Sequence, residues 1–179
     1  MIEADFKPQG GYKELMLGCG QLRKKRLKPE GGADEWQNLI TLDINPSHNP
    51  DVVFDLNQTP WPFQDNQFDE IHAYEVLEHL GQQGDFESFF AHFQEIWRIL
   101  KPGGYLLAST PAWHKMWAWS DPGHRRVISE GSLLFLDQSK YGEDNNPMTD
   151  YRFCYGGNLK LLGCREVSDS LYFTMKAVK

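Results

Sequence analysis

The stretch Leu15-Met16-Leu17-Gly18-Cys19-Gly20 places an apolar triplet directly before two glycines that are separated by one residue. Such a triplet is typical of a short strand covered on both faces, and the glycines predict a tight turn at its end. Four more short apolar runs follow, at residues 39–42, 52–54, 68–73 and 105–108. Because these runs alternate with longer connecting segments, they predict an α/β fold with a largely parallel sheet.

The clearest helix lies before the last of these strands. Apolar side chains recur every three or four residues from Phe86 to Leu100, which is the spacing of one helix face. Asp85 fits the N-cap position of this helix. We expect Pro102-Gly103-Gly104 to stop it, since proline and glycine both disfavour a continued helix.

Two other segments depart from the regular alternation. A crossover helix should connect the first two strands, but Pro29 and the glycines near it interrupt residues 20–39, so we expect only a helical turn or two before a loop. Near the end of the sequence, residues 159–167 and 171–178 read as two strands joined by a short polar turn. We expect them to form a closing antiparallel pair.

Composition limits the class of protein further. The sequence has 179 residues, 40% of them hydrophobic, and we expect one domain over residues 1–179. Its 18 Lys and Arg against 25 Asp and Glu give a net charge of −7, which disfavours nonspecific binding to duplex DNA. No apolar run approaches the roughly 20 residues of a membrane span, and the start lacks the features of a signal peptide. Three scattered cysteines fit no disulfide framework, so we expect a reduced, cytoplasmic protein.

The strand ends carry residues suited to a nucleoside. In open parallel sheets, ligands bind beyond the carboxyl ends of the strands. Gly18 and Gly20 let the backbone approach a ligand closely, because glycine has no side chain and reaches positive φ. Asp43 can accept hydrogen bonds from a ribose diol, and Asp55 can accept one from the amine of adenine. The alternative is a domain without a nucleotide, in which these acids only cap helices.

Four stretches of the chain resemble the class I S-adenosylmethionine-dependent methyltransferases. They read LMLGCG (15–20), TLDINP (41–46), FDLNQTPWPFQDNQFDEIHAYEVLEHL (54–80) and IWRILKPGGYLLASTP (96–111). The resemblance is to a short single-domain subgroup with an L-x-L-G-C-G first motif. Met16 and Leu22 depart from the wider family, which often has an acid and a third glycine there. A nicotinamide-binding domain is disfavoured, because Arg23 occupies the third glycine position of G-x-G-x-x-G.

The resemblance implies a fold, a cofactor and a set of site residues. The fold is a three-layer α/β sandwich around a seven-stranded, mostly parallel sheet with an antiparallel C-terminal strand pair, the Rossmann-like methyltransferase fold. The cofactor is S-adenosylmethionine, with the glycines at its methionine part, Asp43 at the ribose, Asp55 with Leu56 at the adenine and Glu75 on the sulfonium side. The complete set of residues implied to contact the cofactor is Gly18, Cys19, Gly20, Asp43, Ile44, Asp55, Leu56, Ala73, Tyr74 and Glu75.

Segments after the fourth and fifth strands should build the acceptor pocket. Residues 113–126 hold three of the six tryptophans, which indicates either a lid with aromatic faces for a flat or sugar-like acceptor or a local core among solvated charges. For a catalytic base we consider His124, Asp121 and Glu75. His79 is expected to hydrogen-bond backbone at a helix end. The six histidines show no HxxxH or HxH spacing, so the pattern predicts no metal site.

Three functions are compatible with the sequence. The favoured one is methylation of a small molecule, a sugar or an envelope-glycan precursor. The second is a catalytically silent cofactor-binding or scaffold subunit, motivated by the irregular first motif. The third is methylation of RNA or protein, which rests only on the basic cluster of residues 23–26 with Lys28, a cluster that also fits a solvated face. Nucleic acid is the less favoured partner, and the oligomeric state is left open.

Overall fold

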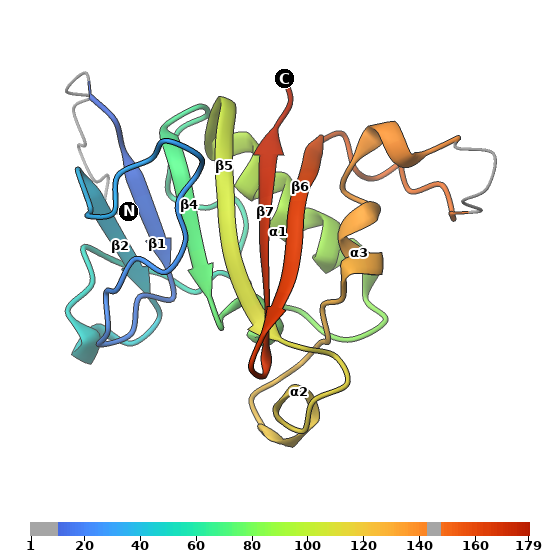
Figure 1. Cartoon of the computed structure of the whole chain (residues 1–179), viewed down its shortest axis with the longest axis horizontal. Coiled ribbons are helices and arrows are strands. Elements are labelled where there is room, and N and C mark those ends of the chain that lie inside the picture. The colour runs from blue at the N-terminus through green and yellow to red at the C-terminus, as the bar shows by residue number, and fades with distance from the viewer. Residues whose placement is uncertain (1–10, 143–147) are drawn as a thin grey trace.

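A seven-stranded sheet runs through the protein, whose computed structural model describes residues 11–142 and 148–179 (Figure 1). The strand order is β3-β2-β1-β4-β5-β7-β6. Neighbouring strands from β3 to β5 pair in parallel, whereas β7 runs antiparallel to both β5 and β6. The α/β class, the seven strands and the antiparallel closing pair are therefore confirmed. The strands are β1 (Glu14–Leu17), β2 (Leu39–Asp43), β3 (Val52–Val53), β4 (Phe68–Tyr74), β5 (Leu100–Pro111), β6 (Leu159–Val167) and β7 (Ser170–Ala177).

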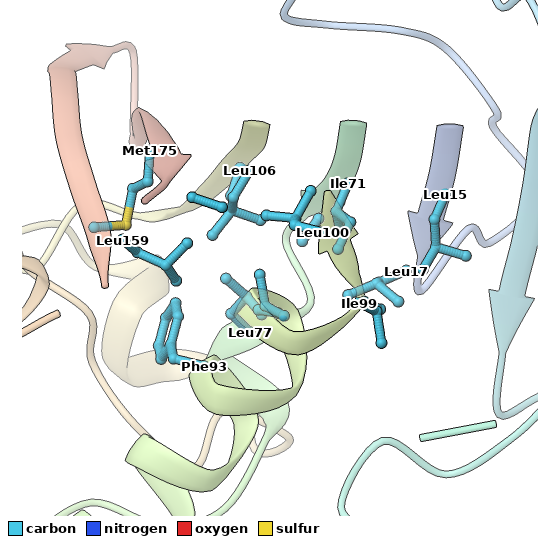
Figure 2. Close-up of a cluster of buried hydrophobic side chains, with 14 of the residues drawn as sticks. Leu15, Leu17, Ile71, Leu77, Phe93, Ile99, Leu100, Leu106, Leu159 and Met175 are labelled. Atoms are coloured by element: carbon cyan, nitrogen blue, oxygen red, sulfur yellow. The ribbon is translucent and has the colours of Figure 1, made fainter. Parts of the chain in front are cut away.

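One face of the sheet packs against helices. The main one is α1 (Phe86–Ile99), and the Asp85 side chain caps it by accepting a hydrogen bond from the Ser88 N–H at 3.0 Å. Side chains of α1 such as Phe93 meet apolar residues from β1, β4, β5, β6 and β7, as Figure 2 shows. The shorter helices are α2 (Trp117–Ser120) and α3 (Glu130–Leu134), and the 3₁₀ turns are η1 (Pro46–His48), η2 (Leu77–His79) and η3 (Gln138–Lys140).

The opposite face of the sheet is covered by an irregular segment. Residues 18–38 form turns and extended chain, so the expected helical turns after Gly20 are wrong. Leu27 and Trp36 of this segment pack on Met16 and Tyr74 of the sheet. A layer is therefore present on this side, but it is made of loop, because Pro29 and the glycines around it do not support a crossover helix.

Charged residues hold this loop to the sheet. The Lys25 ammonium lies 2.5 Å from a Glu14 oxygen and 3.1 Å from a Glu70 oxygen, and its side chain is only 4% exposed. Glu70 also accepts hydrogen bonds from Tyr12 and His72. Burial opposes the charged form of Glu70, but hydrogen bonds from His72, Tyr12 and Lys25 outweigh it and hold its pKa at about 2. A buried ionic network thus anchors the segment that lacks a helix.

Helix α1 ends earlier than the sequence predicts. Its last residue is Ile99, and β5 begins at Leu100, two residues before Pro102. The Pro-Gly-Gly sequence lies inside the strand as a register irregularity: Leu100 pairs with Phe68, while Tyr105 pairs with Glu70. Proline cannot donate to a sheet ladder and Gly103 has φ +79°, so the chain bulges here and then resumes its pairing.

Within the described ranges, no helix has the length and apolar character needed to cross a bilayer.

Candidate cofactor-binding site

The carboxyl ends of β1 to β4 meet at one edge of the sheet, which is the lower edge in Figure 1. A cavity of about 540 Å³ opens there, a size within the usual range of ligand sites. Seven of the ten residues implied to contact the cofactor line it. They are Gly18, Gly20, Asp43, Ile44, Asp55, Leu56 and Glu75. Chain segments far apart in sequence therefore converge on one hollow.

The glycine turn after β1 needs glycine at both ends. Gly18 and Gly20 have φ +57° and +53°, in the left-handed region that glycine adopts at no steric cost. A Cβ atom on Gly18 would lie 2.4 Å from the Val76 Cγ2 atom, so the turn and the segment after β4 are in close contact. At Gly20 the corresponding space is open. The second glycine therefore leaves room at the cavity wall.

Asp43 ties the end of β2 to this turn. One carboxylate oxygen accepts the Gly20 N–H at 2.8 Å, and the other accepts the Asn45 N–H at 2.8 Å. Partial burial opposes the charged form, but the hydrogen bonds from Asn45 and Gly20 outweigh it and hold the Asp43 pKa below its ordinary value. His48 stands 3.3 Å from the same carboxylate. The ionised group keeps lone pairs that can accept further hydrogen bonds from a ligand in the cavity.

Asp55 and Asn57 form the far wall of the cavity beyond β3. An Asp55 oxygen accepts hydrogen bonds from the Asn57 backbone at 2.9 Å and the Asn57 side chain at 3.0 Å. The Oδ1 atom of the Asn57 side chain in turn accepts the Gly81 N–H at 2.8 Å. These bonds connect the loop after β3 to the loop after β4, which closes the cavity on that side.

Glu75 lies where β4 ends, between the cavity and β5. Its φ of +54° is unusual for a residue other than glycine, and such conformations persist where the surroundings hold them. Here Ser109 of β5 supplies two restraints: its carbonyl accepts the Glu75 N–H at 2.8 Å, and its hydroxyl donates to the carboxylate at 2.6 Å. The Glu75 side chain is thereby fixed beside the cavity.

The other three residues of the implied set lie outside this cavity. Ala73 is fully buried in the main core. Cys19 and Tyr74 pack on the opposite face of the sheet, where they line a second hollow of about 360 Å³ with Arg26. This hollow shares Gly18 and Gly20 with the first one. Burial raises the pKa of the Cys19 thiol, which agrees with a packing role.

The aromatic segment after β5 is exposed. Trp113, Trp117 and Trp119 are 55%, 54% and 68% exposed, so the interpretation as a local core is wrong. The Trp119 indole N–H donates to the Trp113 carbonyl at 2.8 Å, which folds the segment back on itself around α2. In Figure 1, α2 lies beyond the carboxyl ends of the parallel strands. Aromatic surface is therefore available at the same edge as the cavity.

His124 and Asp121 lie close together, but His124 does not face the cavity. Pro122, Gly123 and Arg125 of the same segment line the cavity instead. Nε2 of His124 is 3.9 Å from an Asp121 oxygen and also 3.9 Å from a Glu78 oxygen. Asp121 is bonded to the Gly123 N–H at 2.7 Å. Of the three residues considered for a base, Glu75 is the one whose side chain borders the cavity.

Glu78 is a buried acid that the sequence analysis did not single out. Its side chain is 2% exposed, and neither carboxylate oxygen has a hydrogen-bond partner. Burial, with the nearby charges of Glu75 and Asp121, raises its pKa to about 8. Its neighbour His79 shares a hydrogen bond of 2.9 Å between Nδ1 and the Gly123 carbonyl, which confirms the expected backbone contact. The signal in the sequence was a glutamate that, with His79, lies between two leucines, Leu77 and Leu80.

Other cavity residues also escaped prediction. His48, Asn57 and Val76 line the cavity from segments that follow the predicted strand ends, and Phe54 lines it from the last position of the predicted run 52–54. The position of Asn57 had a visible signal, because an aspartate side chain often accepts a hydrogen bond from the backbone N–H two residues further on. Arg125 reaches the site through tertiary contact: its N–H donates to the Glu78 carbonyl at 2.8 Å.

The basic cluster is largely engaged within the protein. Arg23 donates to the carbonyls of His48 and Asn49, Lys28 pairs with Asp34 at 2.7 Å, and Arg26 lies over the Tyr74 ring. Since Lys25 is buried against two carboxylates, the interpretation of the whole cluster as a solvated face is wrong for that residue.

The chain is similar to known proteins in both sequence and fold. A sequence model described as "Methyltransferase domain" matches residues 15–108, which are 94 of the 179 residues. No curated protein sequence gives a match. A solved methyltransferase from Archaeoglobus fulgidus, described as dependent on S-adenosylmethionine, aligns with a TM-score of 0.58 and 17% identity, over 93% of this chain and 86% of that one.

Two further structures align equally well. The N-methyltransferase NodS from Bradyrhizobium japonicum, solved with S-adenosylhomocysteine, has a TM-score of 0.58 and 17% identity over 94% of this chain and 79% of its own. A complex of the Haloferax volcanii Trm112 methyltransferase activator with a putative methyltransferase aligns with a TM-score of 0.59 and 15% identity. This alignment covers 94% of this chain and 84% of that one. At these identities the alignments show a shared fold.

Proposed function

Since the chain belongs to the methyltransferase domain family, we propose that it transfers a methyl group from S-adenosylmethionine to a small molecule, a sugar or an envelope-glycan precursor. S-adenosylmethionine is the cofactor, in line with the family and with the S-adenosylhomocysteine complex of a structural neighbour. The observation that carries the proposal is the convergence of Gly18, Asp43, Asp55 and Glu75 on one cavity at the strand ends.

In this proposal, different residues bind different parts of the cofactor. The Asp43 carboxylate, already oriented by two backbone N–H groups, accepts hydrogen bonds from the ribose hydroxyls. Asp55 and Leu56 form the adenine end, and Ile44, 64% exposed, offers an apolar surface at the cavity mouth. Gly18 and Gly20 border the methionine part.

Arg26 is a new candidate at the methionine end. It lines the second hollow beside Gly18 and Gly20, where its guanidinium lies over the Tyr74 ring. A guanidinium next to a glycine turn can bind a carboxylate through paired hydrogen bonds. We assign Arg26 to the methionine carboxylate, a contact that would explain why Tyr74 belongs to the site without facing the main cavity.

Glu75 is the proposed contact on the sulfonium side. A fixed carboxylate near a sulfonium favours the charged cofactor over its neutral product. The cofactor supplies an activated methyl group, which passes to the acceptor nucleophile as the carbon–sulfur bond breaks and S-adenosylhomocysteine forms. The protein aligns the two reactants and excludes water, which can account for about 7–11 kcal/mol of the barrier. Where the acceptor carries a proton, Glu75 can receive it.

The exposed aromatic segment is the proposed acceptor surface. Trp113, Trp117 and Trp119 lie on or next to α2, at the same edge of the sheet as the cavity. Flat aromatic faces suit a ring-shaped acceptor such as a sugar or an aromatic compound. Lys25 is buried against two carboxylates, and exposed Arg23 and Lys28 have partners on the protein surface; these contacts argue against RNA as the acceptor, because a phosphate backbone requires free cations.

Two measurements test this function. Calorimetry with S-adenosylhomocysteine should show binding to one site, and absence of binding would overturn the cofactor assignment. Methyl transfer from labelled S-adenosylmethionine should then be measured with a panel of sugars, aromatic compounds, RNA and protein. Transfer to a small molecule supports the proposal. Cofactor binding without transfer to any acceptor favours the silent subunit, and transfer to RNA or protein would replace the proposed acceptor class.

A further inference from the structure

Glu78, His79 and His124 bring one carboxylate and two imidazoles together beside the cofactor cavity. One ligand atom from each of the three residues lies within 4.8 Å of the others. Nε2 of His124 is 3.9 Å from a Glu78 oxygen, and the two imidazole rings are 4.7 Å apart at their centres. Because His79 and His124 are 45 residues apart (124 − 79), no short sequence motif reveals this cluster.

The cluster contains buried polar atoms that have no partner among the described residues. Both Glu78 carboxylate oxygens and Nδ1 of His124 are buried without a hydrogen bond. Buried polar groups are nearly always bonded, so these atoms call for a missing partner. The charged groups that act on Glu78 are Glu75 and Asp121, both acidic, and no lysine or arginine of the described chain forms an ion pair with it. A cation would provide the missing partner of the Glu78 oxygens and would offset the negative charge of these neighbours.

The histidine hydrogen bonds also fit metal ligands. The Gly123 carbonyl can only accept, so the 2.9 Å contact places a proton on Nδ1 of His79 and leaves a lone pair on Nε2. A histidine that binds a metal usually donates its other ring N–H to a carbonyl or carboxylate in this way. Asp121 fixes the Gly123 backbone at 2.7 Å, and it also stands 3.9 Å from Nε2 of His124. The His79 ring is thus oriented by a backbone carbonyl, and the Asp121 carboxylate lies close to both the Gly123 backbone and the His124 ring.

We propose that Glu78, His79 and His124 bind a divalent transition-metal ion, with zinc as the best match. Two imidazoles and one carboxylate are a recurrent ligand set for zinc and for ferrous iron. Ligand atoms on one tetrahedral zinc lie about 3.4 Å apart, so the 3.9 Å between His124 and Glu78 requires only small side-chain rotations. Three protein ligands leave at least one position for water or another ligand.

The position of this metal would allow it to take part in the proposed methyl transfer. His79 lines the cofactor cavity as well as belonging to the cluster, so the open coordination position borders the cavity. A divalent ion at that place can bind an acceptor oxygen and lower the pKa of its hydroxyl. This role rests on the proposed methyl transfer, whereas metal binding itself does not.

Direct binding of Co²⁺ and Zn²⁺ to the full chain tests the site. After treatment with a chelator, the protein should bind one equivalent of Co²⁺ with visible absorption bands typical of low coordination number, and Zn²⁺ should displace it. Glu78→Gln, His79→Gln and His124→Gln should each weaken Co²⁺ binding more than about tenfold. His114→Gln is the matched control, because His114 is an exposed histidine of the same segment that faces Glu166 instead.

The outcomes separate the metal from the cofactor. If Co²⁺ does not bind to wild type, or if the three variants bind it as wild type does, the proposal is overturned. His79 is less buried than Glu78, so His79→Gln keeps the test valid if Glu78→Gln fails to fold, as circular dichroism would show. S-adenosylhomocysteine binding is measured in parallel. Loss of metal binding with retained S-adenosylhomocysteine binding in the variants supports the metal site, and a wild type that binds S-adenosylhomocysteine but no metal refutes this inference alone.

Discussion

The Asp43 carboxylate accepts the Gly20 N–H at 2.8 Å, and this bond joins the end of β2 to the glycine turn after β1. One side chain therefore shapes the turn and presents an acceptor to the cavity at the same time. The two functions can be separated by substitution, because asparagine keeps one oxygen acceptor and alanine keeps none.

Asp43→Ala should weaken the binding of S-adenosylhomocysteine by about 1–3 kcal/mol, because the ribose hydroxyls lose a buried partner and the turn loses its support. Asp43→Asn should fall between wild type and alanine. Calorimetry measures both. Asp34→Ala, which removes an exposed carboxylate whose partner is Lys28, should bind as wild type does. Unchanged affinity in Asp43→Ala would contradict the placement of the ribose.

Gly18→Ala should destabilise the protein more than Gly20→Ala. Both residues are in the left-handed region, where a side chain costs about 1–2 kcal/mol. Only at Gly18 does the added Cβ atom meet Val76, at 2.4 Å, so that variant carries an additional steric cost. Denaturant unfolding measures the difference. Adding Val76→Ala to Gly18→Ala should recover part of the loss, and equal losses in the two glycine variants would show that Val76 yields freely.

Glu75→Gln should reduce the preference for S-adenosylmethionine over S-adenosylhomocysteine. The sulfonium carries a positive charge that the product lacks, and a carboxylate at the cavity wall should contribute on the order of 1 kcal/mol, or roughly fivefold in Kd. Parallel titrations with the two ligands check this. Glu87→Gln on the exposed face of α1 is the control. A glutamine variant that loses affinity for both ligands equally would place the sulfonium elsewhere.

Lys25→Met should lower the free energy of unfolding by about 3–5 kcal/mol. Methionine keeps the length of the side chain, but Glu14 and Glu70 would remain buried without their shared cation. Chemical denaturation measures the loss. Lys24→Met replaces an exposed lysine beside it and should cost little. Similar small losses in both variants would mean that water enters the network.

Acid should reveal the same network through Glu70. Its pKa is held at about 2 in the folded protein, below the ordinary value of 4.5, so folding favours the deprotonated form. The stabilisation is full above about pH 4.5 and is lost as the pH falls toward 2. The stability gap between wild type and Glu70→Gln should therefore shrink over that window. A gap that stays constant with pH would show that the Glu70 charge is unimportant.

Local patterns predicted most of the sheet and the strand-end residues, because strand ends of a parallel sheet must meet at one edge. The apolar periodicity that starts at Phe86 and the capping acid Asp85 located α1, because helix faces and caps are set by residues close together in the sequence. At Pro102, local preference predicted the end of the helix. In the structure Pro102 lies in β5, and its irregular pairing with β4 forms a bulge. Lys25 could not be placed from its neighbours, since its partners Glu14 and Glu70 belong to two different strands.

The site beyond β4 depended even more on tertiary contacts. Nothing in the spacing of Glu78 and His124 indicates that their side chains lie 3.9 Å apart. Their proximity follows from backbone bonds between the Glu78 carbonyl and the N–H groups of Arg125 and Arg126. Such long-range pairings become visible only when the whole sheet is assembled.

The loop that replaces the crossover helix shows that no helix is needed there to form the edge of the sheet at which the nucleoside is proposed to bind. In the proposed function, the binding groups at this edge are the glycine turn and two acids at strand ends, and the loop held by Lys25 covers the sheet behind them. That face of the sheet is thus covered without a helix, while the cavity-lining residues at the strand ends are retained. The chain could therefore serve as a small scaffold for protein engineering, with new elements inserted into the loop of residues 21–38.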